Sequence, residues 1–141
     1  MKDLHNKLHF VPLIAPVAAR TDNTAIVSAI IDRQGFESLE IVLVTGTNTD
    51  ANATFAVLVE DGDASDLTGG AAVADAQLLG TEAVAGFTYA DDVECRKIGY
   101  VGDKRYVRVT VTPSGNDSGN IFIAGVAVLG NAANSPTATL S

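Results

Sequence analysis

The fold is decided by Val93–Pro113, which reads Val-Glu-Cys-Arg-Lys-Ile-Gly-Tyr-Val-Gly-Asp-Lys-Arg-Tyr-Val-Arg-Val-Thr-Val-Thr-Pro. In its second half Val107, Val109 and Val111 alternate with Tyr106, Arg108, Thr110 and Thr112. Successive side chains on a strand point to opposite faces, so this half predicts a strand with one apolar and one polar face. Gly102-Asp103 supplies turn residues before it, and Pro113 ends it because proline cannot donate to a ladder. We predict a hairpin in which Val93–Val101 pairs with Lys104–Thr112.

Further strands are predicted on both sides of this hairpin. They are Thr24–Asp32, Ser38–Thr45, Thr54–Glu60, Ala76–Leu79, Phe87–Tyr89 and Asn120–Leu129. The inward side chains of the second and third are predicted to be Leu39, Ile41, Leu43, Phe55, Val57 and Val59. Thr24–Asp32 and Asn120–Leu129 are apolar on both faces, which indicates strands that are central or covered on both sides. Gly125 is expected to let another backbone approach closely.

The alanine-rich segment Ala71–Ala85 is ambiguous between helix and strand. Its Ala, Leu and Gln residues suit a helix. Gly80 and the lack of recognisable caps argue against one. We therefore favour the short strands in and after this segment.

Short strands separated by turns, with no long helix, predict an all-β fold. We expect an antiparallel β-sandwich or jelly roll of about eight strands. The 141 residues fit one domain, with an extended N-terminal arm at 1–23, the sandwich at 24–130 and a flexible tail at 131–141. Pro12 and Pro16 keep the arm extended. The arm lies either over its own subunit's sheet or across a neighbour.

The charge is acidic and unevenly distributed. The net charge is −8, and Asp50–Glu94 holds ten acidic residues without any Lys or Arg. Five of the nine bases lie between Arg96 and Arg108. This balance argues against nucleic acid as the main ligand. Either neighbouring strands balance these charges within one chain, or acidic and basic patches meet between subunits.

Composition also bears on location and partners. Hydrophobic residues make up 47% of the chain and charged residues 18%, which predicts apolar surface covered by a partner. The first residues lack the apolar core of a signal peptide, and no apolar run reaches membrane-spanning length. The single cysteine, Cys95, cannot form an internal disulfide. We expect an intracellular product that does not enter a membrane.

Two groups of residues raise the question of a metal site. Asp61, Asp63 and Asp66 lie close together, and calcium prefers several oxygen ligands. The closing Glu of an EF-hand is missing, so a solvated loop is favoured. His5 and His9 have a spacing that zinc sites use on helices, but no acidic residue of the HExxH pattern lies between them. We predict no metal ligand and no cofactor.

Catalytic motifs are not recognisable either. Cys95 has no histidine nearby in sequence, and no Gly-x-Ser-x-Gly elbow occurs. We predict no catalytic residue and a protein that is not an enzyme.

Three stretches carry a family resemblance. They are Arg20–Glu40, Ala53–Asp63 and Ile98–Pro113. From about Arg20 to Leu129 the chain resembles small proteins encoded in the structural gene blocks of tailed bacteriophages and prophages. The resemblance implies a virion component, a decoration or cement protein on the outer surface of the phage head. It implies the major capsid protein as partner and gives no catalytic residues to carry over.

A cement protein bridges capsomers through contacts of its own subunits, so we expect a homodimer or homotrimer. The residues predicted to lie at interfaces are Phe10, Val11, Leu13, Ile14, Val17, Ile121, Ile123, Leu129, Arg105 and Arg108. Two alternatives stay open. One is another virion part, such as a tail tube, connector or fibre-associated domain; the other is a carbohydrate- or cell-surface-binding module.

Overall fold

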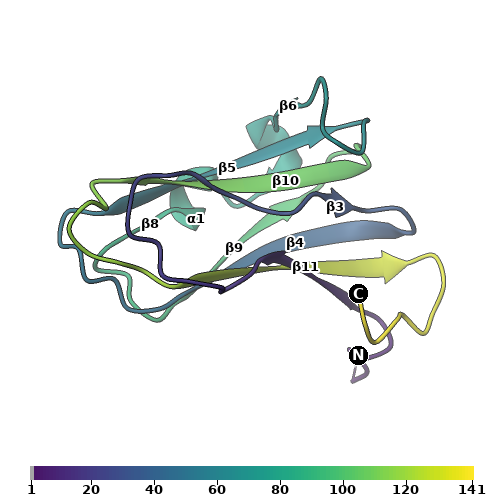
Figure 1. Cartoon of the computed structure of the whole chain (residues 1–141). Helices are drawn as coiled ribbons and strands as arrows, with labels where there is room; N and C mark the ends of the chain where they lie inside the picture. Colours follow the sequence, from purple (N-terminus) through teal and green to yellow (C-terminus); the bar gives the residue numbers. More distant parts are fainter. Residues whose placement is uncertain (1) are drawn as a thin grey trace.

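Two antiparallel β-sheets pack face to face in the computed structural model, which describes residues 2–141 (Figure 1). The first sheet has five strands in the order β1 (His9–Ile14), β11 (Ile123–Ala132), β4 (Phe36–Thr45), β9 (Cys95–Tyr100) and β7 (Leu78–Leu79). In the second sheet β10 (Tyr106–Ser114) and β5 (Thr54–Gly62) are central, with β2 (Ile26–Val27) and β3 (Ile31–Asp32) along β10, and β6 (Ala71–Ala72) and β8 (Phe87–Thr88) along β5. The predicted all-β antiparallel sandwich is confirmed. The jelly-roll strand order stays a prediction.

The core lies between the sheets and is built from alternate residues of the long strands. The inward side chains predicted for β4, β5 and β10 are all buried: Leu39, Ile41, Leu43, Phe55, Val57, Val59, Val107, Val109 and Val111. The sequence predicts about eight strands. Within residues 2–141 there are six longer strands and five of two residues each.

The predicted hairpin is wrong. β9 pairs with β4 and β7 in the first sheet, whereas β10 pairs with β5, β2 and β3 in the second. Residues 101–105 therefore carry the chain from one sheet to the other. Alternation shows which face of a strand is buried but does not name the strand that lies beside it.

A cluster around Tyr100 and Arg33 holds this crossover in place. The Arg33 guanidinium lies 4.8 Å from the centre of the Tyr100 ring. It donates to the carbonyls of Lys104 (3.0 Å), Gly102 (3.0 Å) and Glu37 (3.2 Å). The Tyr100 hydroxyl donates to Asp61 Oδ2 at 2.6 Å and accepts from the Lys104 amide at 3.1 Å. A Cβ at residue 102 would overlap the Tyr100 hydroxyl, so glycine is required there.

The first predicted strand, Thr24–Asp32, is neither continuous nor central. It is broken into β2 and β3, which form an edge of the second sheet, and Val27 is exposed. Ser28 lies at the break, where its amide donates to Val109 O and its Oγ accepts from Val109 N. The next amide, Ala29 N, donates to Leu13 O of the other sheet. The hydroxyl thus replaces a backbone acceptor and lets the chain turn between the sheets.

The N-terminal arm is part of the sandwich. β1 pairs with β11 of the same chain, so the arm lies over its own subunit's sheet and does not reach across a neighbour. Pro12 sits in this strand because proline is tolerated at a sheet edge. The division at residue 23 therefore does not separate two structural units.

The last strand is apolar on both faces, as predicted, and has two neighbours, β1 and β4. At Gly125 the close neighbour is a side chain, and a Cβ there would lie 3.3 Å from the side chain of Ile14. The tail after Gly130 is held by the N-terminal segment. Thr137 N donates to Asn6 O, and Thr137 Oγ1 donates to Leu8 O at 2.6 Å. The prediction of a flexible tail is therefore wrong at Thr137.

The ambiguous alanine-rich segment contains a short 3-10 helix (Asp75–Gln77), β7 and α1 (Glu82–Ala85). The sequence analysis overlooked the cap of α1. Thr81 Oγ1 accepts from Val84 N at 3.1 Å and so replaces a missing intrahelical partner. Phe87–Tyr89 is confirmed as a strand over Phe87–Thr88.

Replacing Tyr100 by Phe tests the crossover cluster. The change leaves the Asp61 carboxylate and the Lys104 amide without their partner in a buried place, so we expect the free energy of unfolding to fall by about 1–3 kcal/mol. Urea denaturation followed by circular dichroism measures it. Tyr89→Phe removes the same atom from an exposed ring and should change stability by less than about 0.5 kcal/mol. Equal effects of the two changes would contradict a structural role for the Tyr100 hydroxyl.

Candidate interaction surface

The outward face of the five-stranded sheet is unusually apolar. Antiparallel sheets commonly bury one face and present a polar face to water. Here the ladder register places apolar side chains outward on every strand. We call this set the outer face: Phe10 and Pro12 of β1, Ala124, Val126 and Val128 of β11 with Phe122 just before it, Val42 and Val44 of β4, Cys95 of β9, and Leu79 of β7. Phe10, Leu79 and Phe122 are each more than half exposed, at 53%, 58% and 52%.

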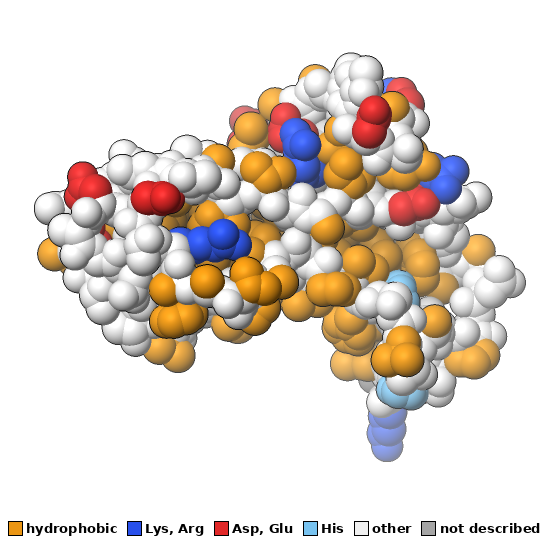
Figure 2. Space-filling view, viewed as in Figure 1, with side chains coloured by type: hydrophobic (Ala, Val, Ile, Leu, Met, Phe, Trp, Pro, Cys, Tyr) orange, Lys and Arg blue, Asp and Glu red, His pale blue; other side chains and the backbone are white. Residues whose placement is uncertain are grey.

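The second sheet is more polar on its outward face, although Val27 and Leu58 are exposed there on either side of Thr110. β10 turns Tyr106, Arg108, Thr110 and Thr112 outward, and Glu60 of β5 lies opposite Arg108. Figure 2 shows hydrophobic side chains gathered along the lower side of the molecule, where the five-stranded sheet lies in Figure 1, and most charged side chains above it. Exposed apolar surface of this extent marks an interaction site in proteins that fold in water.

Two shallow hollows lie side by side on the outer face. One, of about 250 Å³, is lined by Leu8, Leu79, Val101 and Val128 among others. The other, of about 500 Å³, is lined by Leu79, Val84 and Cys95 among others. Both share Glu40, whose carboxylate lies close to where a Cβ of Gly99 would be. Figure 2 shows that the lower side is hollowed between the loop end and the projecting termini.

Four charged residues line the two hollows, Glu37, Glu40, Arg96 and Lys97, and by the ladder register Glu40 and Lys97 are the two that point outward on this face. Burial raises the pKa of the Glu40 carboxyl above its ordinary value of 4.5, and the nearby Lys97 ammonium opposes this rise. The raised pKa fits a carboxyl on an apolar surface.

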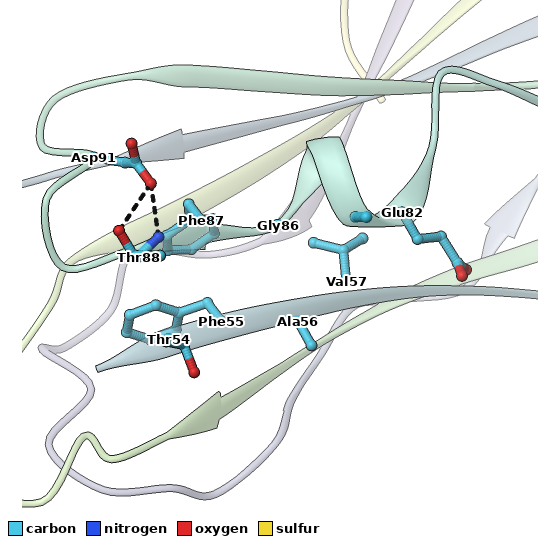
Figure 3. Close-up of a pocket in the computed structure, with 10 residues that line it drawn as sticks. Thr54, Phe55, Ala56, Val57, Glu82, Gly86, Phe87, Thr88 and Asp91 are labelled. Carbon is cyan, nitrogen blue, oxygen red and sulfur yellow. Dashed lines mark hydrogen bonds between the residues drawn. The ribbon is translucent and has the colours of Figure 1, made fainter. Parts of the chain in front are cut away.

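A further pocket of about 440 Å³ lies between β5 and the α1–β8 segment (Figure 3). Its polar groups already bind within the chain. Glu82 Oε1 accepts from Val59 N at 2.6 Å, and Asp91 Oδ2 accepts from Thr88 N at 2.8 Å. Phe55 and Phe87 stack with ring centres 4.6 Å apart. The pocket's side chains therefore hold the edge of β5 against α1 and β8.

The residues considered for chemistry are separated or engaged. His9 lies across from Leu129 and Leu39, whereas Cys95 pairs with Val44, five positions further along β4. Five residues of strand span about 17 Å, so these two side chains are too far apart to act as a nucleophile and base. His9 Nδ1 lies 3.1 Å from Ala138 O, and its ring stacks on Phe36.

The three loop carboxylates point to different partners. Asp61 accepts from the Tyr100 hydroxyl, Asp63 pairs with Lys104 at 2.6 Å, and Asp66 accepts from the Thr68 amide. Within residues 2–141, no three His, Cys, Asp or Glu side chains are grouped as metal ligands. Over the same residues, no helix combines the length and apolar character needed to cross a membrane.

The uneven charge is balanced within the chain. Arg96 pairs with Asp91 and Glu94, and Lys104 pairs with Asp63. Arg105 binds Asp32 through two nitrogens, at 2.8 and 2.9 Å. Four of the five basic residues between Arg96 and Arg108 are therefore paired within the chain, as the first of the two interpretations expects. Charge pairing between subunits stays a prediction.

The structure separates the residues predicted to lie at interfaces into four groups. Leu13, Ile14, Ile121, Ile123 and Leu129 lie in the core, so their assignment to an interface is wrong: each is on the inward side of its strand or loop. Arg105 and Arg108 are engaged with Asp32 and Glu60 of the same chain. Val11 is half-buried against the core. Phe10 and Val17 are exposed, Phe10 on the outer face.

Sequence reasoning overlooked most of the outer face. The missed residues are Pro12, Val42, Val44, Leu79, Cys95, Phe122, Ala124, Val126 and Val128. The signal was present, because the inward positions of β4 were correctly identified and the residues between them had to point outward. What the sequence lacks is any sign that no other segment of the chain covers them.

Comparisons with known proteins identify no family. No family model and no curated protein matches the chain. Among solved structures, one similar chain is a family two carbohydrate esterase from Cellvibrio japonicus, with a TM-score of 0.34 and 9% sequence identity. The match covers 93% of this chain, which spans 36% of the length of that protein. Similarity at this level assigns neither a family nor an activity.

Replacing Glu82 tests its role at the edge of β5. Glu82→Ala leaves the amide of fully buried Val59 without an acceptor, so we expect the free energy of unfolding to fall by about 1–3 kcal/mol. Glu82→Gln keeps an oxygen in the same place and should lose less. Thermal denaturation of the wild type and the two variants compares their stabilities. A Gln variant as unstable as the Ala variant would show that the negative charge matters and not the hydrogen bond.

The pH dependence of stability tests Glu40. A carboxyl whose pKa is raised by folding destabilises the native state when it is ionised. Glu40→Gln mimics the protonated form, so the variant should be more stable than the wild type at pH 7. The difference should shrink as the pH falls through the raised pKa and vanish below the ordinary value of 4.5. Melting temperatures of both proteins from pH 3 to pH 8, taken at a dilution where the protein is monomeric, measure it. A difference that does not change with pH would contradict the assignment.

Proposed function

We propose that this chain is a structural virion protein, a capsid decoration or cement protein that binds the outer surface of a phage head and stabilises it by bridging capsomers. The sequence resemblance along Arg20–Leu129 supports the phage assignment. The observation that carries the role in assembly is the outer face, an apolar sheet surface that the chain itself leaves uncovered. The major capsid protein is the proposed partner, and the proposed activity is binding without catalysis.

The contacts of the proposed mechanism differ from those expected from the sequence alone. β1 occupies its place beside β11, so His9–Ile14 cannot clamp onto a neighbour while the sheet is intact. The segment after β1 remains exposed, with Val17 accessible at 78%. Contacts to the capsid would therefore come from such exposed loop residues, and contacts between copies from a sheet face.

A rigid core supports this role. The basic residues of the Arg96–Arg108 segment are largely paired within the chain, and the crossover is fixed by the Arg33–Tyr100 cluster. A protein that resists internal pressure on a shell benefits from elements that do not move relative to one another. The alternatives, another virion part or a carbohydrate-binding module, would use the same rigid core differently.

Phage heads assembled with and without the protein test the proposal. The capsid protein to use is the one encoded next to this chain's gene, if the gene lies in a structural block. We expect saturable co-sedimentation with the heads, and DNA release at a higher temperature when the protein is bound, followed with a DNA-binding dye. Equal release temperatures and no co-sedimentation would overturn the proposal. Tubes or rings in electron micrographs would favour a tail part, and saturable binding on a glycan array would favour the carbohydrate-binding alternative.

A further inference from the structure

We propose that the outer face binds a second copy of this chain, forming a two-fold symmetric dimer in which two five-stranded sheets pack face to face. This inference deepens the proposed function, because a bridge between capsomers needs two capsid-binding units in one particle. Three properties of the outer face indicate that its partner is a second copy of this chain: its size, its charge, and the positions of Glu40 and Lys97.

The size of the outer face matches a protein interface. Its two longest strands, β4 and β11, have ten residues each. Ten residues span about 33 Å, but β1 and β9 have six residues each and β7 has two, so the five strands together cover about 540 Å². A specific protein interface buries at least about 500 Å² on each partner. One further sheet of the same dimensions would cover the face.

The charge of the outer face favours a copy of the same chain. The whole chain carries a net charge of −8, so two copies repel each other over most of their surface. On the outer face the described strands turn one carboxylate, Glu40, and one ammonium, Lys97, outward. Their charges cancel, so this is a surface where two acidic chains can meet without bringing like charges together.

The positions of these two residues fit a two-fold axis. Glu40 lies on β4 and Lys97 on the adjacent β9, two ladder positions apart, because Lys97 pairs with Val42. A two-fold axis that lies in the interface and passes between them would bring each carboxylate to the ammonium of the other copy. Such an interface uses the same surface on both chains and closes at two. The two sheets would pack about 10 Å apart, with the strands of one sheet crossing those of the other at a large angle, as in orthogonal sheet packings.

Cys95 reports on this interface in the unmodified protein. It is an exposed free cysteine on the outer face, beside Val44. In the proposed dimer it is shielded by the other copy. We expect its rate of reaction with a bulky maleimide to fall as the protein concentration rises, in parallel with dimer formation measured by sedimentation equilibrium. A dimer in which Cys95 keeps its monomer reaction rate at every concentration would overturn the proposal.

Substitutions then locate the surface. Val128→Asp places a charge in the centre of the proposed contact and should weaken association by more than about tenfold. Thr110→Asp is the matched control, because it adds the same charge to the outward face of β10 on the opposite side of the sandwich, and should change association by less than about twofold. Equal effects of the two substitutions would overturn the proposal. Circular dichroism confirms that both variants are folded.

A charge exchange tests the symmetry. Glu40→Lys and Lys97→Glu each bring like charges together across the two-fold axis, so each should weaken the dimer. The double variant restores opposite charges and should recover association to within about threefold of the wild type. A double variant weaker than both single variants would rule out this arrangement.

The inference and the proposed function fail separately. A protein that stays monomeric at every concentration but stabilises heads overturns the dimer and leaves the cement role intact. A dimer that shows the expected protection of Cys95 but does not bind phage heads supports the dimer and overturns the cement role. A trimer would contradict the two-fold arrangement.

Discussion

The buried contact between Arg33 and Tyr100 determines how the two sheets are connected. Arg33 leaves the end of β3 in one sheet, and Tyr100 ends β9 in the other. The guanidinium lies over the ring and binds three backbone carbonyls, which compensates for taking a charge out of water. The hydrogen bond from Tyr100 to Asp61 adds a link to β5, and the same burial raises the pKa of the Tyr100 hydroxyl, which keeps it protonated as a donor. Without this contact the crossover would have no fixed path between the layers.

Local pattern predicted the strands well and their partners poorly. The alternation in β4, β5 and β10 identified the inward side chains because each strand has one face in the core. The same alternation suggested a hairpin at Gly102-Asp103, since turn residues between two strands usually join neighbours. The contact that prevents the hairpin comes from Arg33, which donates to the Gly102 carbonyl and lies 69 residues before it in sequence. No pattern within Val93–Pro113 indicates this contact. Likewise, Thr24–Asp32 was predicted as one strand, but Ser28 lies at a break that divides it into β2 and β3.

The candidate surface was predictable in part. The apolar character of β11 on both faces was visible in the sequence, as was the expectation of covered apolar surface. The residues chosen for the interface fell mostly on the inward side, because the sequence does not say which of two apolar faces meets the chain's own core. Only the paired sheets show that β4 and β11 have neighbours on one face and solvent on the other. The charges, by contrast, could be assigned only once the salt bridges were seen within the chain.

The edges of the two sheets set a limit on growth. β1 is an edge strand that contains Pro12, and the edge formed by β2 and β3 is interrupted at Ser28. An interrupted edge, or one that lacks an N–H donor, is a poor template for a strand from another molecule. Many copies crowded on one surface would therefore find it hard to join into endless ribbons. When two sheets pack face to face, each face is covered by one partner and no further copy can add there. Copies of this protein crowded on one surface would therefore form separate small oligomers and not continuous ribbons.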